Sequence, residues 1–355
     1  MKRYIAALLL ILLILFAAQP LFSSDIPELD LDSLANIKLP EPTQPKPTEP
    51  KPTETEAVQP TQTEEATEPT PEPTQPLPEG SVMVSYEPET VDPGNTFTGL
   101  DPLECVSFIV PDAENTRRLS NEQTDFSFGA AKGGEPHWIT VDNQELFDRL
   151  NVNTLAWDNK TGRKYLYLTF DCGYEYENLT SEILDILNDK NVPAAFFCTL
   201  SYLKEAPDVV TRMIREGYTV GNHSTTHPNC TKLTREQMAW EILGVENYLR
   251  VNFGYSSRYF RFPSGQYSPN MLDVADSVGQ RTVFWSIAHA DWDPENQPGV
   301  QKTYNTITSR LHPGAVILLH TTSPDNVAVL ADFIDYARDQ GYEFRTLDDY
   351  PFWKE

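Results

Sequence analysis

The chain contains the run Leu166-Tyr167-Leu168-Thr169-Phe170-Asp171-Cys172-Gly173-Tyr174-Glu175, which is apolar up to its aspartate. A short run that is apolar on both alternating faces is typical of a parallel strand buried on both sides. Six further strand-like runs follow, at 194–198, 219–222, 259–261, 282–284, 315–319 and 343–345. Helix-like segments separate them, at 181–189, 208–216, 235–251, 270–278, 303–310 and 326–340. This alternation predicts an α/β fold, a barrel or an open sheet, with its active site at the carboxyl ends of the strands.

Polar or aromatic side chains follow five of these strands at or just beyond their ends. They are Asp171, the pair His223 and His227, Arg261, Asp291 with Trp292, and His320. Each has an ordinary explanation when taken alone, such as a helix cap, an ion pair or core packing. Because the carboxyl ends of parallel strands meet at one rim, the set together predicts a hydrolytic site.

The spacing of four between His223 and His227 brings two imidazoles to one side of a turn or compact loop. Two histidines so placed indicate a divalent metal, most simply Zn²⁺, although a structural pair bonded to the backbone is the alternative. Pro228 biases His227 away from helical geometry, which favours a loop at a strand end.

The order and spacing of five segments resemble the motifs of the polysaccharide deacetylase family, the NodB-homology domain. The segments are Thr169-Phe170-Asp171, His223-Ser224-Thr225-Thr226-His227, Arg261-Phe262-Pro263-Ser264-Gly265, Asp291-Trp292 and Leu318-Leu319-His320. The resemblance covers residues 160–350. It implies a distorted (β/α) barrel of about seven parallel strands and hydrolysis of an N-acetyl group from an amino sugar.

The resemblance also implies roles for the motif residues. Asp171 is expected to be the general base, with Arg261 keeping it ionised, and His320 the general acid. The pair His223 and His227 is expected to hold the metal. The substrate-binding residues are expected to be Trp292 and Tyr174.

Two positions depart from the usual motifs of the family. Most members have a second aspartate after the base, as a metal ligand, and this chain has Cys172. A Cys172 thiolate is one candidate ligand, and the alternatives are that the residue is a bystander or forms a disulfide with Cys198. Ala288 stands where many members carry an aspartate that supports the acid histidine, so we expect His320 to be oriented by another residue.

A narrower resemblance links the run from Phe170 to Glu175 and the run from His320 to Asn326 to the muramic-δ-lactam-forming branch. That branch deacetylates N-acetylmuramic acid in peptidoglycan of the spore cortex. One alternative substrate is N-acetylglucosamine in peptidoglycan or chitin-like polymers, because residues outside the motifs choose the sugar. An alternative of another class is a catalytically inactive module that binds cell-wall glycan.

Composition excludes some partners and divides the chain. The net charge of −25 argues against nucleic acid, which needs clustered Lys and Arg. Residues 1–24 are typical of an export signal, because their apolar stretch is shorter than the roughly 20 residues that span a bilayer. Contact with the membrane is therefore expected only if this segment is not cleaved.

The remaining divisions follow from local composition. Residues 25–80, rich in Pro, Thr and Glu, are expected to be a disordered spacer. Residues 81–159 are expected to be an extension that packs on the catalytic domain, residues 160–350. We expect an exported protein that acts at the cell wall. The histidines outside the motifs, His137, His289 and His312, are expected to be surface or structural residues.

Overall fold

The protein is described by a computed structural model that covers residues 76–354, apart from residues 93 and 128. The predicted leader, 1–24, and most of the predicted spacer, 25–80, lie outside these residues. Within the described residues, no helix has the length and apolar character needed to cross a membrane.

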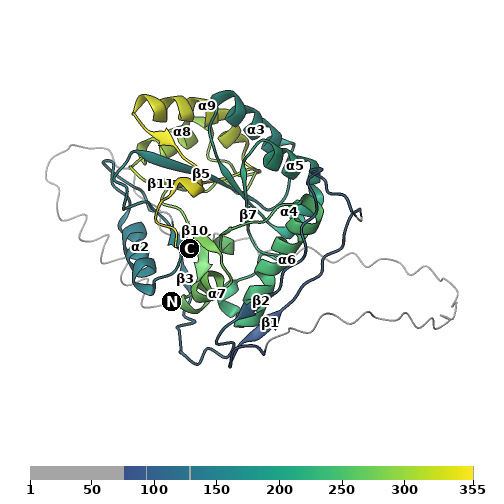
Figure 1. The fold of residues 1–355 in the computed structure, drawn as a ribbon. Coiled ribbons are helices and arrows are strands. Elements are labelled where there is room, and N and C mark those ends of the chain that lie inside the picture. Colours follow the sequence, from purple (N-terminus) through teal and green to yellow (C-terminus); the bar gives the residue numbers. More distant parts are fainter. Residues whose placement is uncertain (1–75, 93, 128, 355) are drawn as a thin grey trace, which may run out of the picture. The chain divides into compact units, whose positions relative to one another are not determined.

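The core of the fold is one parallel sheet of eight strands (Figure 1). Along the chain they are β4 (Thr154–Leu155), β5 (Tyr165–Cys172), β6 (Ala195–Cys198), β7 (Thr219–Asn222), β8 (Tyr259–Phe260), β10 (Arg281–Val283), β11 (Ala315–His320) and β12 (Glu343–Phe344). Their order is β11-β5-β6-β7-β8-β10-β4, and β12 pairs with β5. Isolated bridges Trp157↔Ala315 and Ile287↔Ile317 link the far end of the sheet to β11. The predicted distorted barrel of parallel strands is confirmed, with β4 as an additional strand.

All six predicted helices are present, with ends shifted by a few residues. They are α3 (Leu179–Lys190), α5 (Pro207–Arg215), α6 (Arg235–Phe253), α7 (Pro269–Ser277), α8 (Val300–Ser309) and α9 (Pro324–Asp339). Three begin at a proline, which fits the first helical turn because it lacks an N–H that would otherwise be unpaired there. The short helix α4 (Leu200–Glu205) was not predicted, and Thr199 caps it.

Strand β5 shows how the sequence sorts its side chains between two layers. Leu166, Leu168 and Phe170 join the apolar layer that contains residues of α3 and α9. Tyr167 belongs to a separate apolar cluster with residues of β4, β6, β8, β10 and β11. Because side chains alternate along a strand, Asp171 lies on the same side as Tyr167. The Asp171 carboxylate is thereby placed on top of a packed apolar interior.

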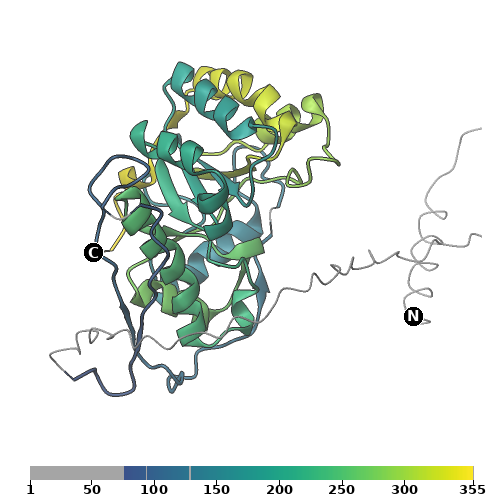
Figure 2. The same ribbon diagram turned by 90° about the vertical axis from the view of Figure 1, so that its right-hand side faces the viewer.

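The N-terminal extension packs closely on the barrel and adds elements of its own. Its hairpin, β1 (Val82–Val84) and β2 (Phe108–Val110), lies beside α6 (Figures 1 and 2). Strand β3 (Thr124–Asp125) pairs with β9 (Gln266–Tyr267), and helix α2 (Trp138–Leu150) leads into β4. Since β4 belongs to the main sheet, the barrel begins before the expected boundary at residue 160.

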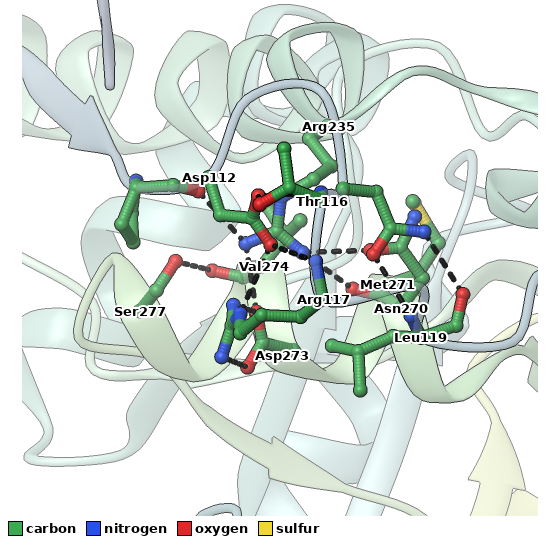
Figure 3. Close-up of polar contacts among 12 residues, drawn as sticks. Asp112, Thr116, Arg117, Leu119, Arg235, Asn270, Met271, Asp273, Val274 and Ser277 are labelled. Carbon is green, nitrogen blue, oxygen red and sulfur yellow. Dashed lines mark hydrogen bonds and ion pairs between the residues drawn. The ribbon is translucent and has the colours of Figure 1, made fainter. Parts of the chain in front are cut away.

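An ion-pair cluster fastens the extension to helices α6 and α7 (Figure 3). Asp273 accepts hydrogen bonds from Arg117 of the extension (2.6 Å) and from Arg235 of α6 (2.7 Å). Arg235 is 2% exposed and also donates to Asn270 and to the carbonyl of Pro111. A buried guanidinium needs such partners, because an unpaired buried charge is strongly destabilising.

We predict that Asp273→Ala lowers the free energy of unfolding by about 2–3 kcal/mol, because Arg235 then loses its only anionic partner among the described residues. Urea denaturation of the purified domain measures this. The control is Asp185→Ala, which removes an exposed partner of Arg212 and should cost about 1 kcal/mol or less. Equal losses in the two variants would contradict a special role for the buried pair.

Candidate active site

A cavity of about 780 Å³ opens at the carboxyl ends of the strands. Residues of the motifs, of the extension and of other loops line it: Asp125, Phe126, Ser127, Asp171, Gly173, Tyr174, Thr199, Ser201, His223, His227, Ser264, Trp285, Ala288, His289, Trp292, Leu318, His320 and Thr322. Most of the predicted site residues therefore share one cavity.

Arg261 lies beneath the cavity and fixes the carboxylate of Asp171. Its Nη1 donates to Asp171 Oδ1 at 2.7 Å, and both residues are buried. Its remaining donors reach Thr169 Oγ1 and the carbonyls of Val283 and Phe284. The guanidinium also stacks 4.1 Å above the ring of Phe197. The arginine is thus held by hydrogen bonds and stacking, which fixes the position of the carboxylate.

The pKa of Asp171 is set by opposing effects. Burial by itself raises the pKa of the carboxyl, but the charge of Arg261 is the largest opposing effect, and the net pKa is lowered. Asp171 is therefore ionised at neutral pH and can accept a proton.

His223 and His227 meet in the loop after β7, with ring centroids 4.9 Å apart. The Nδ1 of His223 is 2.9 Å from the carbonyl oxygen of Arg261, so the neutral ring donates there and leaves the lone pair of Nε2 free. That Nε2 is 3.5 Å from Asp171 Oδ2. Burial lowers the pKa of His223 to about 4, so at pH 7 this contact is not an ion pair. A neutral imidazole whose second nitrogen is held by a carbonyl is the usual form of a metal ligand.

Cys172 does not join this group. Its side chain is fully buried in the apolar layer with Cys198, on the opposite face of β5 from Asp171. Burial, followed by a hydrogen bond with Cys198, raises the pKa of the Cys172 thiol well above its ordinary value. All four cysteines, including this facing pair, are free thiols. The thiolate-ligand hypothesis therefore does not fit the geometry, and Cys172 and Cys198 lie side by side as free thiols without a disulfide.

The histidine pair offers only part of a metal site. No cluster of three His, Cys, Asp or Glu side chains able to hold a metal occurs among residues 76–354, as far as the structure describes them. Catalytic zinc sites usually carry three protein ligands, so the pair supplies two of them and leaves the other positions to water or substrate.

His320 is oriented by Asp291, which is the partner that the sequence left unassigned. Nδ1 of His320 lies 2.7 Å from Asp291 Oδ1, and its backbone N–H donates to Oδ2 at 2.9 Å. Asn326 donates to the same Oδ2 at 2.6 Å. Burial lowers the pKa of His320, but the charge and hydrogen bond of Asp291 outweigh burial and raise the net pKa. His320 is thus kept protonated to higher pH, as a general acid requires.

Two aromatic side chains stand exposed at the edge of the cavity. Trp292 is 53% exposed and meets the ring of His320 at 6.1 Å, edge to face. Tyr174 is 43% exposed. Exposed aromatic faces beside an acid and a base suit the apolar face of a sugar ring. Both residues line the cavity, and their role in substrate binding stays a prediction.

Several cavity residues escaped the sequence analysis. His289, expected to be structural, lines the cavity and contacts Asn326 at 3.2 Å. Asp125, Phe126 and Ser127 come from the extension, where no chemical spacing was visible. The signal for Asp291 is present in the Asp291-Trp292 motif, but its bond to His320 depends on tertiary folding.

Comparisons with known proteins place this geometry in a family. Residues 158–283 match the family model described as polysaccharide deacetylase. The peptidoglycan-N-acetylmuramic acid deacetylase PdaA of Bacillus subtilis is 35% identical over 68% of this chain and 91% of its own length. The solved structure of Bacillus subtilis PdaA, described as a family 4 carbohydrate esterase, superimposes with a TM-score of 0.62 and 35% identity over 67% of this chain and 100% of the other.

A chitooligosaccharide deacetylase of Sinorhizobium fredii is 31% identical over 53% of this chain and 92% of its own length. Residues 158–355 make up less than three fifths of the chain, so a match over 68% includes part of the N-terminal extension. The match to the chitooligosaccharide deacetylase covers 53% of this chain, which residues 158–355 alone could supply. The matched motifs, the barrel and this degree of identity show that the chain belongs to the polysaccharide deacetylase family.

Proposed function

We propose that the protein hydrolyses N-acetyl groups of amino sugars in peptidoglycan, and that the acetylated sugar is N-acetylmuramic acid, in muramic δ-lactam formation of the spore cortex. The observation that carries the reaction class is a carboxylate with a lowered pKa and an imidazole with a raised pKa lining one cavity. A protein that acts on this polymer works outside the membrane, which agrees with the predicted export signal.

Asp171 of β5 and His320 of β11 are register partners on adjacent strands, and they divide the proton transfers. Asp171 accepts the proton of the water that attacks the acetamido carbonyl, and Arg261 keeps it ionised between turnovers. His320 donates to the departing sugar nitrogen, which leaves poorly as an amide anion. The products are acetate and a free amine.

A divalent metal, which we propose is Zn²⁺, would be held by His223 and His227. When bound, it would polarise the acetamido carbonyl and the attacking water. The chain contributes two imidazoles, with His223 oriented by the carbonyl of Arg261.

One finding supports N-acetylmuramic acid as the substrate. The match to the relative named for that sugar covers 68% of this chain and so includes part of the N-terminal extension. The alternative substrate, N-acetylglucosamine in peptidoglycan or chitin-like polymers, uses the same catalytic residues. Assays on peptide-free muramyl glycan and on chitooligosaccharide separate the two. Preference for chitooligosaccharide would overturn the muramic assignment.

We predict that Asp171→Asn releases acetate from muramyl glycan at least about 10²-fold more slowly than the wild type, because the amide cannot accept the proton of water. Acetate is measured by an enzyme-coupled assay. If neither protein releases acetate while the wild type still binds wall glycan, the inactive binding module is the correct interpretation.

A second prediction concerns the alkaline limb of the pH–rate profile. Activity needs protonated His320, so it falls as pH rises through the pKa of this residue. Asp291→Asn removes the charge that raises this pKa, and burial then lowers it. The alkaline limb of kcat/KM should move to lower pH in the variant. An unchanged limb would show that another group supplies the proton.

The metal assignment generates a third prediction. His227→Ala should weaken Zn²⁺ binding about tenfold or more, because one of two imidazole ligands is lost. Cys172→Ala should leave Zn²⁺ affinity nearly unchanged, since this thiol lies in the apolar layer behind β5. Isothermal titration calorimetry measures both. If Cys172→Ala lost a comparable amount of Zn²⁺ affinity, the Cys172 thiolate would be a metal ligand after all.

A further inference from the structure

One side of the cavity is built by the N-terminal extension and carries a carboxylate that the catalytic steps do not use. Asp125, Phe126 and Ser127 line the cavity, although they precede the first motif by more than 40 residues. The segment reaches the cavity because β3 pairs antiparallel with β9, in register Asp125↔Gln266. Strand β9 directly follows the motif that contains Arg261.

Phe126 anchors this segment. Its N–H donates to the carbonyl of Gly265 at 2.9 Å. Its ring stacks on Phe284 at 4.6 Å and meets Trp285 edge to face at 5.4 Å. Phe126 is 3% exposed, whereas Asp125 and Ser127 on either side of it are exposed. The anchor therefore holds two polar side chains at the cavity without burying them.

A short chain of hydrogen bonds orients the carboxylate of Asp125. Its Oδ1 accepts from Gln123 Nε2 at 2.7 Å. Gln123 Oε1 in turn accepts from Asn229 Nδ2 at 2.9 Å and Thr231 Oγ1 at 3.2 Å. Asn229 follows His227 by two residues, so the chain ties the extension to the loop of the histidine pair. Asp125 Oδ2 has no hydrogen-bond partner among the described residues and remains available to a ligand.

We propose that Asp125 is a substrate-specificity residue that accepts hydrogen bonds from hydroxyl groups of a second sugar unit, adjacent to the acetylated one. The inference rests on the proposed function, because it takes a glycan strand as the substrate. A carboxylate forms strong, charge-assisted hydrogen bonds with hydroxyl donors. The cavity, at about 780 Å³, is much larger than an acetamido group and is of the size that takes a larger ligand.

The extent of similarity supports a role for the extension in choosing the polymer. The match to the relative named for N-acetylmuramic acid includes part of the extension, and the match to the chitooligosaccharide enzyme does not require it. A residue of the extension that touches the neighbouring sugar would connect that difference to substrate choice.

The test compares two substrates with wild type, Asp125→Ala and Asp125→Asn. One is a peptide-free muramyl glycan of four sugar units, and the other is 4-nitrophenyl acetate, which has no sugar. Asp125→Ala should raise KM for the glycan about tenfold, the loss expected of one hydrogen bond to a charged group, with a much smaller change in kcat. The loss in kcat/KM should be far smaller for the ester, and Asp125→Asn should recover part of the glycan affinity.

Glu122→Ala is the matched control, because Glu122 is an exposed carboxylate of the same segment that does not line the cavity. It should behave as wild type. If the wild type deacetylates the glycan and Asp125→Ala has the same KM, this inference is wrong and the proposed function stands. If the wild type hydrolyses the ester but not the glycan, the proposed function fails first. Equal losses on both substrates would show that Asp125 acts on the reacting group or on folding.

Discussion

The buried ion pair between Arg261 and Asp171 is the interaction on which the site depends. Both groups are withdrawn from water, and each would be costly without the other. The arginine is held by the carbonyls of β10 and its neighbour Phe284 and by the hydroxyl of Thr169, so the pair joins several strands of the barrel at one point. Its backbone carbonyl also orients His223. One residue therefore sets the charge of the base and the tautomer of a metal-ligand candidate.

The pair of Asp291 and His320 is built on the same principle. Asp291 is buried and receives hydrogen bonds from His320 and Asn326. Its charge raises the pKa of His320, whereas Arg261 lowers that of Asp171. Two carboxylates thus serve different purposes because their partners differ. In the proposed reaction, Asp171 accepts a proton and Asp291 favours the protonated form of His320.

The sequence predicted what depends on local pattern. The seven strands and six helices were visible because their apolar residues repeat with the period of each element. Helix α2 was missed because its buried positions include Thr140 and Gln144, and Gln144 accepts from the backbone of Ala156 instead of filling a core. The strand ends in the sequence located the motif residues. Whether Cys172 could bind a metal depended on which face of β5 it occupies, and this was known only once the structure placed Asp171 at the cavity. Asp125 reaches the cavity through pairing of β3 with β9, which no local pattern reveals.

The central claim is that Arg261 overrides burial and keeps Asp171 ionised. The most direct test is a pH titration of the Asp171 carboxyl carbon by ¹³C NMR in the wild-type protein, assigned with Asp171→Asn. A pKa below the ordinary value of aspartate is expected. A pKa at or above that value would contradict the account, because the carboxyl would then be governed by burial.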